Sequence, residues 1–140
     1  MRYLTKKDLI VDAFERLIDE SSKDEEGILD DQVDRAIEIV ETYIGRRYDV
    51  TAIFDDHNPI RNEVLISIIS RITLYKTVRR NAARKVPADY KEDYDDAMED
   101  LEKINTGRLK LEGLPLAKDD QGNVKSTSIS GNNSNKDFYI

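Results

Sequence analysis

Apolar residues recur at helical spacing in four stretches of the chain, and the stretch at residues 59–80 is apolar on more sides than the others. At 100° per residue its main face consists of Val64, Leu65, Ile68, Ile69, Ile72 and Tyr75. Ile66 and Leu74 project to other sides, so we expect several neighbours to cover this helix. Asn58 and Pro59 predict its start, because asparagine caps first-turn amides and proline has its φ already set for a helix.

Two helices are predicted before this central one. The first runs from about residue 5 to residue 20, and Thr5 with Asp8 forms a capping box in which aspartate replaces the usual glutamate. The second is capped by Asp30 or Asp31 and extends to about residue 48. Its apolar face consists of Val33, Ala36, Ile37, Val40, Tyr43 and Ile44.

The fourth helix opens at Pro87, runs to about residue 105 and ends before Gly107, which suits a left-handed position. Its apolar stripe consists of Tyr90, Tyr94, Ala97, Met98, Leu101 and Ile104. We expect it to form an antiparallel hairpin with the central helix across a basic linker at residues 81–86. Residues 108–111 alternate between polar and apolar, which predicts a short edge strand.

The chain is therefore predicted to be all-α, a small bundle of about four helices with an extended C-terminal arm. Residues 1–112 form the helical domain and residues 113–140 the arm, because the latter are rich in Ser, Asn and Gly and lack periodicity. An apolar cluster ends the arm, and we predict that it anchors the arm in a partner's apolar pocket. This partner anchor consists of Phe138, Tyr139 and Ile140.

Composition argues against most kinds of chemical site. The chain has no cysteine and one histidine, which excludes disulfides and the usual zinc sites. The acidic loop around Gly27 does not fit an EF-hand, because Ser22 and Val33 would fall at the first and last ligand positions. His57 is interpreted as an exposed loop residue. We predict no catalytic residue, no metal and no cofactor.

The charge and the apolar runs narrow the location and the partners. No apolar run approaches the roughly 20 residues that span a bilayer, and the N-terminus lacks the apolar stretch of a signal peptide, so we expect synthesis in the cytoplasm and no membrane partner. A net charge of -7 argues against a general nucleic-acid coat, because phosphate binding needs clustered cations.

Charge separates along the predicted hairpin, which leaves two interpretations open. Its first half is basic through Arg71, Lys76, Arg79, Arg80, Arg84 and Lys85, and its second half is acidic through residues that include Asp95, Asp96 and Glu99. These charges are either the solvated faces of two helices or the two sides of a head-to-tail interface between subunits. The candidate subunit-interface residues are Arg71, Lys76, Arg79, Arg80, Arg84, Asp95, Asp96 and Glu99.

In their order and spacing these landmarks resemble the head-to-tail connector, or head-completion, proteins of Mu-like tailed phages. The resemblance covers about residues 1–112 and is carried by YLTKKDLI, DDQVDRAIEIVETYIGRRYDV, ISRITLYKTVRR and AMEDLEKINTGRLKL. It implies a non-enzymatic virion protein, made in the host cytoplasm, that forms a ring, typically dodecameric, beneath the portal protein. Such a ring extends the DNA channel and offers a docking surface to a tail or neck protein.

Arg46 and Arg47, at the end of the second predicted helix, are candidates for lining that channel. DNA would then pass without sequence-specific binding. The alternatives are a helical nucleic-acid-binding or regulatory protein that uses Arg79, Arg80 and Arg84, and a helical enzyme. Against the enzyme stands the absence of a nucleophile-base pair, a glycine-rich loop or an HExxH motif from the sequence.

Overall fold

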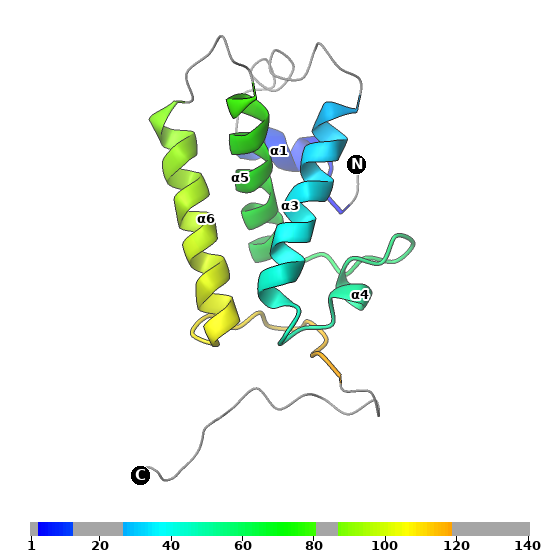
Figure 1. The fold of residues 1–140 in the computed structure, drawn as a ribbon. Coiled ribbons are helices and arrows are strands. Elements are labelled where there is room, and N and C mark those ends of the chain that lie inside the picture. Colours follow the sequence, from blue (N-terminus) through cyan, green and yellow to red (C-terminus); the bar gives the residue numbers. More distant parts are fainter. Residues whose placement is uncertain (1–2, 13–26, 81–86, 119–140) are drawn as a thin grey trace, which may run out of the picture.

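The structure, a computed structural model, describes residues 3–12, 27–80 and 87–118, and these form a helical bundle. The helices are α1 (Lys6–Asp12), α3 (Ile28–Ile44), α4 (Val50–Ile53), α5 (Glu63–Arg79) and α6 (Ala88–Thr106). Figure 1 shows α3, α5 and α6 side by side with α5 in the middle, and α1 behind them. The short α4 lies on the side of α3 away from α6. The prediction of an all-α bundle is confirmed.

The central position of α5 is confirmed, because this helix contacts α1, α3 and α6. Ile68 and Ile72 on its predicted face are buried, and so are Ile66 and Leu74 on its other sides. Val64 departs from the prediction with 40% of its surface exposed. At 100° per residue it shares a side of α5 with the half-exposed Arg71, so the buried surface is centred away from Val64.

The predicted start of the central helix was wrong by four residues. The helix begins at Glu63, and its N-cap is Asn62, whose side chain accepts hydrogen bonds from the amides of Val64 and Leu65. Residues 59–61 remain non-helical because the Ile60 amide donates to the Ile53 carbonyl at 2.9 Å. Pro59 therefore does not set the start of the helix, because a hydrogen bond to the preceding α4 segment holds residues 59–61 in a non-helical conformation.

The boundaries of α3 also differ from the prediction. Its N-cap is Gly27 in a left-handed conformation (φ 78°), and no side chain caps the helix there. Asp30 and Asp31 lie in the first turn instead, where their charges favour the positive end of the helix dipole. The helix ends at Ile44, and the predicted apolar face is buried at Val33, Ala36, Ile37, Val40 and Ile44.

The hairpin of α5 and α6 is confirmed, with the chain running in opposite directions along the two helices in Figure 1. Tyr75 of α5 stacks on Tyr94 of α6 with 4.3 Å between ring centroids. Gly107 ends α6 in the expected left-handed conformation (φ 84°). The first predicted helix begins as expected at Lys6, but its predicted end and the linker at 81–86 lie outside the described residues.

The edge strand predicted at residues 108–111 is not formed. The amides of Arg108 and Leu109 both donate to the Lys103 carbonyl, at 2.8 and 3.1 Å, and so complete the end of α6. The Leu111 amide donates to the hydroxyl of Tyr48 at 2.8 Å. Alternating polarity here reflects a turn and not a strand, because the end of α6 and the Tyr48 side chain accept hydrogen bonds from amides that a strand would need.

Candidate assembly surfaces

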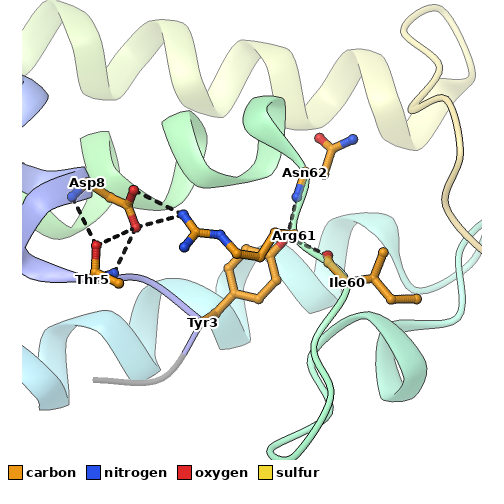
Figure 2. A network of polar contacts seen from close by, with 6 residues as sticks. All are labelled: Tyr3, Thr5, Asp8, Ile60, Arg61 and Asn62. Atoms are coloured by element: carbon orange, nitrogen blue, oxygen red, sulfur yellow. Dashed lines mark hydrogen bonds and ion pairs between the residues drawn. The ribbon is translucent and has the colours of Figure 1, made fainter.

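Tyr3 ties the N-terminal segment to the start of α5, as Figure 2 shows. Its hydroxyl donates to the Ile60 carbonyl at 2.8 Å and accepts from the Asn62 amide at 2.9 Å. Its ring meets Phe54 edge to face, with centroids 4.8 Å apart. Burial raises the pKa of Tyr3, although the hydrogen bond from Asn62 and the charge of Arg61 act in the opposite direction. The hydroxyl therefore stays protonated, so it can donate to the Ile60 carbonyl while it accepts from the Asn62 amide.

Asp8 adds a charged link to the same place (Figure 2). One of its oxygens accepts from the Thr5 amide at 2.8 Å, and the Thr5 hydroxyl lies 3.3 Å from the Asp8 amide, so the predicted capping box is confirmed. Both carboxylate oxygens also accept from Nη2 of Arg61, at 3.0 and 2.9 Å. Burial alone would raise the pKa of Asp8, but the hydrogen bonds from Thr5 and Arg61 and the charge of Arg61 lower it.

Three of the candidate interface cations form a cluster at the C-terminal end of α5, here called the basic end: Lys76, Arg79 and Arg80. Arg79 and Arg80 are exposed, and Lys76 is half-buried. The guanidinium of Arg79 lies 5.9 Å from the ring centroid of Tyr75, a cation-π distance. Arg84 lies outside the described residues. The basic end therefore presents long cationic side chains where the helix leaves the bundle.

Arg71, the remaining candidate cation on α5, is directed to its own subunit. Its Nη1 lies 4.0 Å from a carboxylate oxygen of Asp100 on α6. At this distance the pair is a weak, partly exposed ion pair and no hydrogen bond. The hairpin thus brings one basic and one acidic residue of its two halves together within the subunit.

The outer side of α6 carries exposed carboxylates, here called the acidic face of α6: Glu92, Asp95, Asp96, Glu99 and Glu102. Two of the predicted interface acids have partners on the same helix. Lys91 donates to Asp95 at 2.7 Å, which raises the pKa of Lys91, and Lys103 lies 3.3 Å from Glu99. Such exposed pairs on one helix are screened by water and contribute little to stability, so they do not commit either acid to its own subunit.

Arg46 and Arg47 both bond to the end of α6. Nε of Arg47 donates to the Asn105 carbonyl at 2.8 Å, and Nη2 of Arg46 donates to the same oxygen at 3.1 Å. Cations at this position complement the negative end of the helix dipole. Within the subunit the half-buried Arg47 links the segment after α3 to the end of α6, and Arg46 is exposed. The channel-lining role of both residues stays a prediction.

The beginning of the predicted C-terminal arm packs on the helical body. Tyr48 and Leu116 form an antiparallel bridge, in which the Asp49 amide donates to the Pro115 carbonyl and the Ala117 amide donates to the Arg47 carbonyl. Leu114 and Ala117 are buried. Residues 114–117 are here called the C-terminal strip. The partner anchor, Phe138 to Ile140, lies outside the described residues.

An open groove, here called the acidic groove, lies between α3, the N-terminal segment and the turn after α4. It has a volume of about 620 Å³, and the rings of Tyr3 and Phe54 line it together with four carboxylates: Asp30, Asp34, Asp55 and Asp56. A second hollow of about 560 Å³ shares Asp34, Asp55 and Asp56 and extends to Glu41. Arg61 also lines the acidic groove, and its guanidinium pairs with Asp8.

A comparison with known protein families covers nearly the whole chain. The family model described as bacteriophage Mu, Gp36 matches residues 3–128. The chain belongs to the bacteriophage Mu Gp36 family. It is therefore a protein of Mu-like phages, and the match spans every surface described above. Comparisons with curated proteins and with solved structures gave no significant match.

Among the residues that the structure describes, no group of three or more His, Asp or Glu side chains is placed to hold a metal ion. The predicted interpretation of His57 as an exposed loop residue is confirmed. Within the same residues, no helix combines the length and the apolar character that a membrane span requires.

Sequence reasoning missed the acidic groove of the Gp36-family chain. Asp30 and Asp34 are one helical turn apart, so their common side of α3 was readable from the sequence. Asp55 and Asp56 lie in a stretch without apolar periodicity, for which the sequence indicates only a polar turn. Their approach to α3 depends on α4 and on the bond from Ile60 to Ile53, and neither gives a hydrophobic pattern long enough to detect.

Proposed function

We propose that this Gp36-family chain is a non-enzymatic structural protein of the virion. It forms a ring, typically dodecameric, at the portal vertex, connects the capsid to the tail and extends the DNA channel. Membership of a Mu-like phage family supports this proposal, as does the resemblance of residues 1–112 to head-to-tail connector proteins. The partners are the portal protein, a tail or neck protein and further copies of the chain.

The observation that carries the proposal is the separation of opposite charges on one subunit. The exposed Arg79 and Arg80 lie at the C-terminal end of α5, whereas the acidic face runs along α6 and the acidic groove is lined by α3, the N-terminal segment and the turn after α4. Opposite charges at different places on one subunit complement each other between copies, which makes the contact head-to-tail. Head-to-tail contacts close into rings when the rotation per subunit allows it.

The C-terminal arm is assigned to the neighbouring neck or tail protein. The C-terminal strip fixes where the arm leaves the body, through the bonds of Asp49 to Pro115 and of Ala117 to Arg47. The strip thus sets the point from which the chain continues toward the anchor at Phe138 to Ile140, and linkage to the ring raises the effective concentration of that anchor at a neighbouring partner.

The DNA in such a ring must slide, so tight phosphate binding would oppose function. A net charge of -7 and the use of Arg47 by the end of α6 both favour weak contact with DNA. We expect sequence-independent DNA affinity that is weak at physiological salt. Tight binding of the purified chain would favour a nucleic-acid-binding protein instead.

The test combines the mass of the purified chain with the joining of heads to tails in phage particles. The double variant Arg79→Glu, Arg80→Glu should assemble less than the wild type and should leave more heads unjoined. Its melting temperature should fall only slightly, because both side chains are exposed and the contact of Arg79 with Tyr75 is a surface cation-π contact. Added salt should weaken wild-type assembly, since exposed charges are screened. A chain that stays monomeric and is dispensable for joining would overturn the proposal.

A further inference from the structure

Three side chains of the hairpin contact one another near the C-terminal end of α5 and are here called the tyrosine-arginine stack: Tyr94, Tyr75 and Arg79. The rings of Tyr75 and Tyr94 are stacked, with their centroids 4.3 Å apart and their planes inclined by 25°. The guanidinium of Arg79 lies 5.9 Å from the centroid of the Tyr75 ring. Both rings are half-buried, whereas Arg79 is exposed. The two helices thus position the rings, and the Tyr75 ring positions a cation at the surface.

The charge of the tyrosine-arginine stack is not balanced within its own subunit. Among the described residues, no carboxylate forms an ion pair with the Arg79 guanidinium. A guanidinium binds a carboxylate through two parallel hydrogen bonds, and one that already rests on a ring loses less freedom when it does so. Tyrosine and arginine are also enriched among the residues that contribute most to binding at protein interfaces. The stack therefore fits a carboxylate supplied from outside the subunit.

The acidic face of α6 contains two carboxylates of this kind. Its Asp95 and Glu99 have lysine partners on the same helix. Glu92 and Asp96 are exposed, and neither forms an ion pair with a described residue. They are four residues apart and so share a side of α6, and they are here called the outer acid pair. At 100° per residue, this side lies about 160° around the helix from Tyr94.

We propose that the tyrosine-arginine stack of one copy binds the outer acid pair of the next copy. This inference rests on the proposed function and names the surfaces through which neighbouring subunits meet. The two surfaces lie on opposite sides of α6, so they do not meet within one subunit. A contact between two different surfaces leaves each copy with a second surface for a further neighbour, so the contact repeats head-to-tail.

Nucleic acid is the competing partner, because arginine and aromatic side chains also bind phosphates and bases. A nucleic-acid strand carries a continuous row of negative charges, and exposed acids follow Tyr94 along α6. They would repel such a strand over several turns of the helix. The α6 helix of a neighbour carries Lys91 and Lys103 beside its acids, and these lysines balance part of its charge. Charge complementarity therefore favours a second copy of the chain.

Charge exchange tests the contact on the full chain. Arg79→Glu alone and Asp96→Lys alone should each raise the concentration at half-assembly by about tenfold, because each places like charges together. The two changes in one chain restore an attractive pair and should recover most of the loss. An equimolar mixture of the two single variants should also assemble, since each copy then meets a complementary neighbour. The matched control is Arg79→Glu with Glu102→Lys, which changes the net charge equally at another exposed position of α6.

A second pair of variants tests the aromatic part of the stack without a change of charge. Tyr75→Leu removes the ring beside Arg79 and should raise the concentration at half-assembly by about threefold. Tyr75→Phe keeps the ring and should assemble like the wild type. Circular dichroism at the assay temperature checks that both variants remain folded. Equal assembly of the two variants in their folded state would overturn the role of the ring.

The outcomes separate this inference from the proposed function. Rescue of Arg79→Glu by Asp96→Lys, and not by Glu102→Lys, supports the contact. Rescue by both changes or by neither overturns it, while a wild-type mass of many subunits leaves the ring in place. Binding of duplex DNA at physiological salt that Arg79→Glu abolishes also overturns the contact. A wild-type chain that stays monomeric overturns it as well, and the joining of heads to tails in particles then decides the proposed function separately.

Discussion

The two ends of α5 differ in what holds them. At its start, Asn62 caps the helix, Tyr3 bonds to the preceding backbone, and Arg61 pairs with Asp8. At its other end, Arg79 in the last turn and Arg80 at the C-cap are exposed, and Arg79 lies over the ring of Tyr75. The start of α5 is thus held by side-chain hydrogen bonds and an ion pair within its own subunit, whereas its C-terminal end carries exposed positive charge. Stability and assembly are therefore separable by mutation.

The largest effect on stability is expected from the buried middle part of α5, between its two ends. Ile72→Ala removes a fully buried side chain and leaves a cavity, which should lower the free energy of unfolding by about 2 to 5 kcal/mol. Val64→Ala is the matched control, because Val64 is 40% exposed and should change stability by about 0.5 kcal/mol or less. Urea unfolding of both variants measures the difference. Equal losses of stability in the two variants would mean that Ile72 contributes no more burial than Val64.

The second-largest effect on stability is expected at the start of α5. Tyr3→Phe keeps the ring but leaves the Asn62 amide without its acceptor and the Ile60 carbonyl without its donor, at a cost of about 1 to 3 kcal/mol. Tyr90→Phe, at a half-buried position on α6, is the control and should cost less. Thermal unfolding compares the two. No loss for Tyr3→Phe would show that water replaces both bonds and that this start is less firmly held.

The N-cap of α5 gives a smaller effect with a clear sign. Asn62→Ala removes the acceptor for the Val64 and Leu65 amides and should cost about 1 kcal/mol. Asn58→Ala, the cap that the sequence pattern favoured, should be nearly neutral. If Asn58→Ala were the more damaging change, the helix would start where the pattern placed it.

The smallest effect is a dependence on acid. The pKa of Asp8 in the folded chain lies below its usual value of 3.8, so the unfolded chain binds the extra proton first as the pH falls. Asp8 therefore contributes stability that is complete above about pH 5 and is lost as the pH drops through the folded pKa. Asp8→Asn should flatten the fall in melting temperature between about pH 5 and pH 2, whereas Asp96→Asn should not.

The long helices were predictable because each buries a face that repeats at 3.6 residues. Val33, Ile37 and Val40 in α3, and Ala97, Leu101 and Ile104 in α6, are buried as their spacing predicted. The capping box of Thr5 and Asp8 and the left-handed Gly107 were also predictable, because such features depend on neighbours in the sequence.

Features that depend on distant residues could not be read in this way. The start of α5 is held by Tyr3, and the turn after α6 is held by Tyr48, and both partners lie far away in the sequence. The same holds for Arg47, whose partner at Asn105 is far away in sequence. Arg79 on α5 and Asp95, Asp96 and Glu99 on α6 are exposed, and their role at a subunit interface stays a prediction. The acidic groove could not be read from the sequence, because it needs a three-dimensional arrangement of α3 and the turn after α4.

The C-terminal strip has a mechanical consequence. A pull applied beyond Lys118 reaches the body through the backbone bonds of Ala117 to Arg47 and of Asp49 to Pro115 before it reaches any helix. These two bonds and the small buried surface of Leu114 and Ala117 are weaker than the bundle behind them. Under a pulling force, the C-terminal strip should therefore detach from the body before α3, α5 and α6 unfold. The distance between the helical body and the point of pulling would then increase while the bundle stays folded.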